Sequence, residues 1–231
     1  MTQQADEVTG TPIVVSVRGE ANVEADPELC EFAVTVTARD RDRRTALEQL
    51  TRRNKELLDQ VRAGYGEALE KLETGHFSVY PEWRGKRSEK VGPYQGSVRI
   101  RIVVKDFAVL GEMVTKLADG EGRAIDGPYW TLRRDSEVHQ RARTEAVGEA
   151  VRRAREYAAA VGSTLTQLLE LADTGMSGGA PHPGARVMDA VAFAGSGAAD
   201  EGVPALDLEP VRQNVYAEVE ARFSATQPRK L

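Results

Sequence analysis

The residues best suited to chemistry gather near the start of the chain, in the stretch VSVRGEANVEADPELCEFAVTV at residues 15–36. Asp26 and Glu28 flank a proline, and Cys30, the single cysteine, follows. Two neighbouring carboxylates could serve as a general acid and base, and a thiolate could serve as a nucleophile. A proline fixes φ and an aspartate bonds turn backbone, so the same residues are typical of a hairpin corner. Cys30 alternates in phase with Phe32 and Val34, which favours a buried cysteine, and we expect a corner rather than an active site.

Other candidate catalytic or metal-binding residues are scattered. The histidines are His76, His139 and His182, and none has the i, i+4 spacing or the neighbouring cysteines and carboxylates of a metal site. GSGAAD at 195–200 resembles part of a dinucleotide fingerprint, but it neither follows a predicted strand nor opens a helix. We therefore predict no metal, no cofactor and no catalytic residues.

Aromatic residues offer a different kind of site. Tyr80 and Trp83 precede the charged segment RGKRSEKVGPYQG and Tyr94 lies near its end, and tyrosine and tryptophan are enriched at binding hot spots. They could cap a hairpin or form a contact surface, and we take them as candidate interface residues. Tyr129 and Trp130 present the same choice, with core packing favoured for one of the two.

A basic set of residues lies on the first predicted helix. It comprises Arg43, Arg44, Arg52, Arg53 and Lys55. Such a face is usually solvated, and the alternative is that it binds an acidic partner.

Composition narrows the classes of function. The chain has 231 residues, a net charge of −5 and 41% hydrophobic residues, as expected of a globular protein without a basic field for nucleic acid. A single cysteine forms no internal disulfide, the N-terminus does not read as a secretion signal, and no stretch reaches the ~20 apolar residues of a membrane span. We expect a cytoplasmic protein.

Hydrophobic periodicity predicts seven strands and three helices. Alternating residues indicate strands, and apolar residues at helical spacing indicate helices. The order is strand–strand–helix twice, over about 13–63 and 69–119, and then strand–helix–strand–strand. The predicted strands are 13–25, 30–39, 69–83, 94–105, 122–134, 164–173 and 207–224. The predicted helices are 41–63, one that Asp106 would cap and that carries Val109 to Leu117, and 135–161. The first two strands are expected to pair as a long hairpin.

The last predicted helix has a column of small residues that would let it lie close to a sheet. The column is Ala142, Ala146, Ala150, Ala154 and Ala158.

Three segments stand apart from the periodic pattern. Residues 1–12 are polar and expected to be disordered, 175–206 are rich in Gly, Ala and Pro, and 226–231 form a tail. The middle one is either disordered or a lid.

Two motifs carry a resemblance over residues 13–225. One is G-x-A-x-V-x-A-x-P, formed by Gly19, Ala21, Val23, Ala25 and Pro27, and the other is S-V-Y-P-E at 78–82. With the order of elements, they resemble the SIMPL domain (DUF541) family, which includes a brucella immunogenic periplasmic protein. The resemblance implies an α+β fold, assembly of some members into ring- or channel-like oligomers, and no agreed catalytic residues. Many members are exported, whereas this sequence shows no signal.

Together these observations predict one α+β domain, a mainly antiparallel curved sheet of about seven strands with three helices packed against it. The expected function is that of a non-enzymatic interaction or assembly protein. The family resemblance implies a homo-oligomer, and a protein partner is a further option. The alternative is a small-molecule binding protein with 175–206 as its lid, and an enzyme is the least favoured reading.

Overall fold

A computed structural model describes residues 13–83, 91–174 and 205–229. The chain divides into two compact units. Of the described residues, unit 1 contains 13–25, 135–174 and 214–229, and unit 2 contains 26–83, 91–134 and 205–213. The α+β class is confirmed, with three helices and seven strands in two antiparallel sheets.

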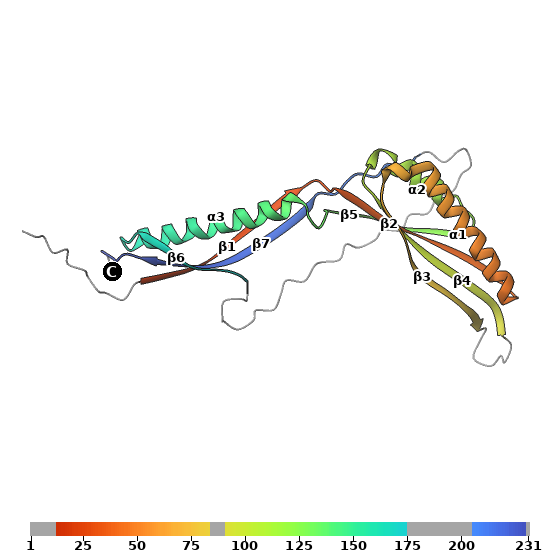
Figure 1. Ribbon diagram of the computed structural model, residues 1–231, viewed down its shortest axis with the longest axis horizontal. Helices are drawn as coiled ribbons and strands as arrows, with labels where there is room; N and C mark the ends of the chain where they lie inside the picture. Colours follow the sequence, from red (N-terminus) through yellow and green to blue (C-terminus); the bar gives the residue numbers. More distant parts are fainter. Residues whose placement is uncertain (1–12, 84–90, 175–204, 230–231) are drawn as a thin grey trace, which may run out of the picture. The chain divides into compact units, whose positions relative to one another are not determined.

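Unit 2 has a four-stranded sheet in the order β3-β4-β2-β5 (Figure 1). Two helices and two short 3₁₀ turns, Gly66–Ala68 and Phe107–Val109, complete it. The elements are β2 (Leu29–Asp40), α1 (Arg43–Tyr65), β3 (Leu69–Trp83), β4 (Val91–Val104), α2 (Leu110–Ala118) and β5 (Arg123–Thr131).

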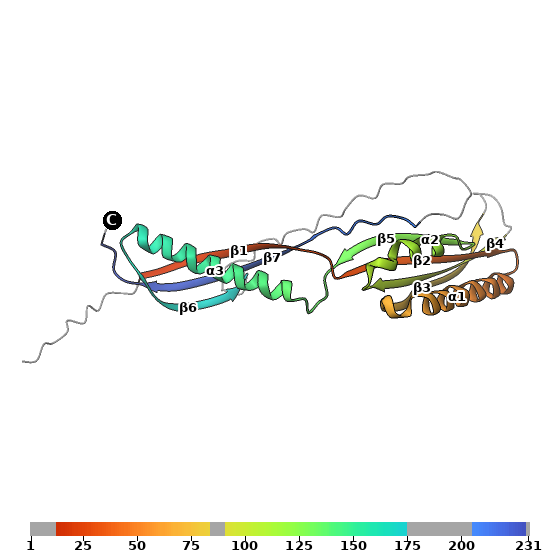
Figure 2. The same ribbon diagram turned by 90° about the horizontal axis from the view of Figure 1, so that it is seen from above.

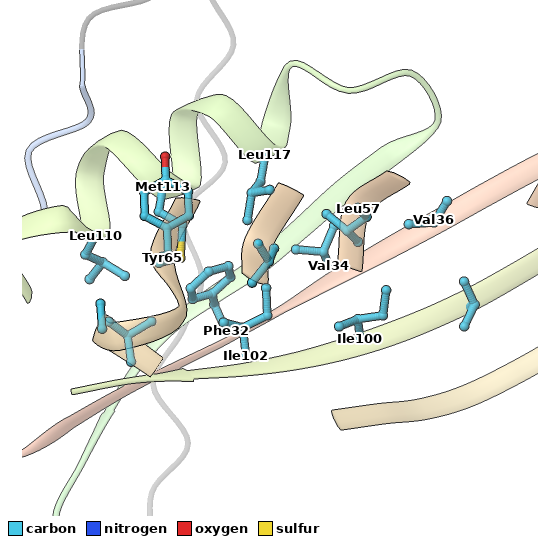
Figure 3. Close-up of a cluster of buried hydrophobic side chains, with 14 of the residues drawn as sticks. Phe32, Val34, Val36, Leu57, Tyr65, Ile100, Ile102, Leu110, Met113 and Leu117 are labelled. Atoms are coloured by element: carbon cyan, nitrogen blue, oxygen red, sulfur yellow. The ribbon is translucent and has the colours of Figure 1, made fainter. Parts of the chain in front are cut away.

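Both helices of unit 2 cover one face of its sheet. Every second residue of β2, from Cys30 to Ala38, is buried, and the alternate residues of β4 from Val98 to Val104 match them. Leu57 of α1 and Met113 of α2 pack onto this face with Phe32 and Ile100 (Figure 3). The predicted inward face of the second strand is confirmed.

The start of α1 is fixed by Asp42. Its carboxylate accepts a hydrogen bond from the backbone N–H of Thr45 at 2.8 Å and another from the Thr45 hydroxyl at 3.0 Å. These bonds satisfy an N–H group that the first helical turn would otherwise leave unpaired. They also lower the pKa of Asp42, because they stabilise the charged carboxylate.

Unit 1 has a three-stranded sheet in the order β1-β7-β6, with one helix along it (Figures 1 and 2). Its elements are β1 (Ile13–Ala25), α3 (Glu137–Ala160), β6 (Leu165–Asp173) and β7 (Gln213–Ala225). The predicted alanine column of α3 is confirmed as the buried stripe of the helix.

α3 approaches β1 very closely at Gly19. A Cβ on this glycine would lie 2.1 Å from the backbone oxygen of Ala146 and 2.7 Å from the Cβ of Ala150. Two small side chains on the helix and none on the strand therefore allow the two backbones to come together. This contact belongs to the hydrophobic core of unit 1, which also contains Val17 and Phe223 and is separate from the core of unit 2.

The predicted hairpin of the first two strands is wrong. β1 pairs with β7 in the sheet of unit 1, whereas β2 lies between β4 and β5 in the sheet of unit 2. The seven strands consequently form two sheets and not one curved sheet. A period of two shows which face of a strand is buried, but it does not identify the neighbouring strand. The segment Asp26–Glu28 therefore leads from one unit to the other.

In unit 2, β3 and β4 are consecutive strands that pair as an antiparallel hairpin. Residues 1–12 and 175–204 lie outside the described residues, so the predicted disorder and the predicted lid are not addressed by the structure. Of the predicted tail, the described part continues the contacts of unit 1: the backbone N–H of Arg229 donates to the carbonyl oxygen of Val161 at 3.1 Å.

Candidate functional site

The two carboxylates of the Asp26-Pro27-Glu28 segment are engaged in contacts within unit 2. Asp26 pairs with Arg212 at 3.0 Å, and a Glu28 oxygen accepts a hydrogen bond from the backbone N–H of Arg133 at 2.8 Å. The backbone N–H of Glu28 donates to the carbonyl oxygen of Thr131 at 3.0 Å. These contacts tie together three separate chain segments, which is a structural role.

Cys30 is fully buried in the core of unit 2. Burial, with a smaller contribution from the charge of Glu31, raises the pKa of its thiol to about 12. The reactive thiolate is therefore scarce at neutral pH, and the expectation of a core cysteine is confirmed.

The histidines do not gather into a site. His76 is exposed on β3 and His139 is half-buried on α3, while His182 lies outside the described residues. In the described ranges, no three His, Cys, Asp or Glu side chains are grouped as a metal ion would need.

None of the helices described is both long and apolar enough to cross a membrane.

The candidate interface residues Tyr80 and Tyr94 point to opposite faces of the β3–β4 hairpin. Tyr80 is paired with Gln95, and Pro81 is paired with Tyr94. Paired residues share a face and successive residues alternate, so the two tyrosines are on different sides of the sheet. Tyr80 is 49% exposed, on the face away from the helices.

Trp83, the third candidate, ends β3, and its backbone pairs with Val91. Its side chain lies outside the described part of the structure. The role of these three residues in an interface stays a prediction. For the pair Tyr129 and Trp130, Trp130 packs edge-on against Phe107 with ring centroids 5.0 Å apart, while Tyr129 is exposed, as expected for one core residue of the two.

The face of the four-stranded sheet away from the helices carries paired charges. Arg101 makes two hydrogen bonds of 2.5 Å to the carboxylate of Glu31, and Arg99 lies 2.5 Å from Asp126. Asp126 also accepts a hydrogen bond from the hydroxyl of Tyr129 at 2.8 Å, and its pKa is lowered chiefly by the bond from Arg99. Each of these two arginines has a carboxylate partner, so this surface is solvated and charge-balanced.

Strand β6 presents an apolar surface that the sequence reasoning did not identify. Leu168 and Leu171 pair with Phe223 and Ala221, both buried on the α3 side of the sheet. The two leucines therefore face that side too, yet each is 48% exposed. The reason is that α3 packs against β1 and contacts β6 little.

Leu169 adds a third leucine to this surface, also 48% exposed. It sits where the register of β6 against β7 shifts, between Leu168 and Glu170. β6 lies at the edge of this sheet, so among the described strands none pairs with the backbone groups on its outer side. We call Leu168, Leu169 and Leu171 the β6 leucine edge. The leucine content of residues 165–171 was the available signal, but the bulge interrupts the period-two pattern that would have shown a face.

The chain matches a known protein family. The family described as "SIMPL: Protein of unknown function (DUF541)" matches residues 15–223. This range covers nearly the whole chain and both units. A search of curated proteins found no match.

Proposed function

The chain belongs to the SIMPL (DUF541) family, and within that family of unknown function we propose that it is a non-enzymatic protein that associates with a second copy of itself. The observation that carries the proposal is the β6 leucine edge. Three half-exposed leucines on a nine-residue edge strand combine apolar surface with backbone groups that pair with no described strand. Such a combination is a template for pairing with another strand.

A second copy fits this edge for a geometric reason. Two identical edge strands can pair antiparallel about a twofold axis, because each then offers the other the same surface. Pairing of β6 with β6 would join two three-stranded sheets into one of six strands. The leucines on the α3 side would then meet their counterparts across the new pair. The surface is small, so we expect a weak association of about micromolar affinity or weaker.

The experiment is the mass of the chain in solution by sedimentation velocity, over about 5 to 500 μM to span the expected affinity. We expect the wild-type mass to rise with concentration. Leu168→Gln combined with Leu171→Gln should reduce it to the monomer. Leu206→Gln is the matched control, because Leu206 is 54% exposed but lies on no sheet edge, and it should leave the association unchanged.

The same experiment tests whether the candidate interface residues of the β3–β4 hairpin take part in the association. Tyr80→Ala is compared with Tyr157→Ala, a tyrosine of similar exposure on α3. If Tyr80→Ala alone abolishes the association, the interface lies on the β3–β4 hairpin and the assignment to β6 is wrong. A chain that stays monomeric at every concentration would refute self-association.

A further inference from the structure

A cavity of about 420 Å³ in unit 2 is lined by charged residues. It lies between α1 and the turn that joins α2 to β5. Its lining consists of Arg52, Arg53, Glu56, Glu121 and Arg123. The volume is within the range of small-molecule sites, about 300–1,000 Å³, but the lining is charged where most such sites are apolar. A ligand for it would therefore be hydrophilic and charged.

Arg53 is held in place at this cavity. One terminal nitrogen donates a hydrogen bond to the backbone oxygen of Thr37 at 2.7 Å, and the other pairs with Glu121. The side chain of Arg53 is only 17% exposed, whereas that of Glu121 is 85% exposed. The guanidinium is thus fixed, and its carboxylate partner is the part that can move into solvent.

Within the described part of the chain, the other two guanidiniums make no hydrogen bond to a carboxylate. Arg123 donates through Nη1 to the side-chain oxygen of Gln60 at 2.9 Å and to the carbonyl oxygen of Leu117 at 3.5 Å, both neutral acceptors. Among the residues that the structure describes, no carboxylate forms an ion pair with Arg123. Arg52 forms only a loose, exposed ion pair with Glu56, in which the Arg52 Nε lies 3.9 Å from the carboxylate, too far for a hydrogen bond.

Two glycines of the α2–β5 turn make room for these arginines. A Cβ on Gly120 would lie 2.2 Å from the Nε of Arg123, and one on Gly122 would lie 2.8 Å from the Nη1 of Arg53. Gly122 also has a φ of +68°, which favours glycine. Glycine at both positions therefore leaves the space that these two guanidiniums occupy beside the cavity.

We infer that this cavity binds the phosphate group of a small hydrophilic molecule. A phosphate carries a charge of about −1.5 to −2 near neutral pH and offers three acceptor oxygens, which suits several guanidinium donors. Arg53 and Arg123 would hold the phosphate, and Arg52 would approach from α1. Glu121 would leave Arg53 and turn to solvent, because the ligand supplies the negative charge in its place. Arg99 and Arg101 on the open face of the sheet differ, because each already has a carboxylate partner at hydrogen-bond distance.

The test is a titration of the full ¹⁵N-labelled chain, followed through backbone amide shifts of residues 119–123. The probes are inorganic phosphate and glycerol 3-phosphate, with citrate as a carboxylate comparison. We expect saturable shifts with a dissociation constant of about 1 mM or tighter for at least one phosphate probe.

Three variants sharpen the test. Arg52→Gln should weaken binding by about 5-fold or more, and Glu121→Gln should tighten it, because a competing carboxylate is removed. Arg44→Gln is the matched control: it removes the same charge from α1 at a position outside the cavity lining and should leave the affinity unchanged. Arg52 is 69% exposed, so its replacement does not threaten the fold.

Several results would overturn the inference. One is the absence of saturation with both phosphate probes up to about 50 mM, far above the expected dissociation constant. Another is binding that Arg52→Gln and Glu121→Gln leave unchanged. If citrate binds here and the phosphates do not, the assignment to a phosphate group is wrong.

Discussion

The close approach of α3 to β1 makes a specific prediction for Gly19. Replacing it with alanine places a methyl group 2.1 Å from the backbone oxygen of Ala146. Carbon atoms of real side chains essentially never come nearer than 3.0 Å, so the helix and strand must separate by about 0.9 Å at this point. The obstacle is helix backbone and not the end of a flexible side chain, so it cannot simply rotate away.

The cost follows from the packing around this contact. Extra atoms forced into a well-packed core cost about 1–3 kcal/mol, and a gap of 0.5–1 Å removes a quarter to a half of each dispersion contact it opens. Because the five buried alanines of α3 depend on this close approach, we expect Gly19→Ala to lower the free energy of unfolding by about 2–3 kcal/mol.

Gly148 provides a control with the same chemical change. It is exposed in the interior of α3, and a Cβ there meets nothing within 4 Å. Alanine is about 1 kcal/mol better than glycine inside a helix, so Gly148→Ala should raise the stability. The two substitutions are therefore expected to have opposite signs.

The assay is urea unfolding followed by circular dichroism at 222 nm. With a slope of about 1–3 kcal/mol per molar urea, Gly19→Ala should move the midpoint down by about 0.7–3 M. A Gly19→Ala protein as stable as the wild type would refute the close packing of α3 on β1. A loss of stability in Gly148→Ala would instead show that this glycine has a contact absent from the structure.

Three further predictions concern single residues. Cys30 should react with a thiol reagent at pH 8 only after unfolding in urea, since a pKa of about 12 leaves almost no thiolate; equal rates in native buffer would contradict its burial. The folded state lowers the pKa of Asp42, so its stabilisation is present above the unfolded value of about 3.9 and is lost as pH falls through the folded value. Asp42→Asn should therefore make the free energy of unfolding, measured in urea, depend less on pH in this acidic range. An unchanged pH dependence there would contradict the role of Asp42 at the start of α1. Gly122→Ala forces alanine to a φ of +68° and places its Cβ 2.6 Å from the Thr37 oxygen, so it should destabilise the protein by about 1–3 kcal/mol in the same assay; wild-type stability would show that the turn relaxes freely.

Local patterns predicted much of this fold because they report burial directly. The alternation in β2 identified its inward residues, and the alanine spacing identified the face of α3. A strand that is half-buried must alternate, and a helix that lies close to a sheet needs small residues at i, i+4. The α3 column and the small residues Gly19 and Ala21 of β1 were both visible in the sequence. Their complementarity was the signal that these two elements pack together.

Pairing between distant strands could not be predicted in the same way. β1 and β7 both alternate, and nothing in either pattern identifies its partner, so the proline between β1 and β2 suggested a hairpin. The cavity was missed for a similar reason. Arg52 and Arg53 were recognised as part of a basic helix face, but Glu121 and Arg123 lie some seventy residues later and meet them only through the tertiary fold.

The place of β7 in its sheet has a consequence for synthesis of the protein. β7 is the central strand of β1-β7-β6 and comes last of the seven in the chain. Translation adds about 5–20 residues per second, so β1 leaves the ribosome about 10–40 s before its hydrogen-bonding partner exists. All four strands of the other sheet have been made by residue 131. Until β7 has been made, β1 lacks the strand with which it pairs, so its alternating apolar residues have no sheet to join.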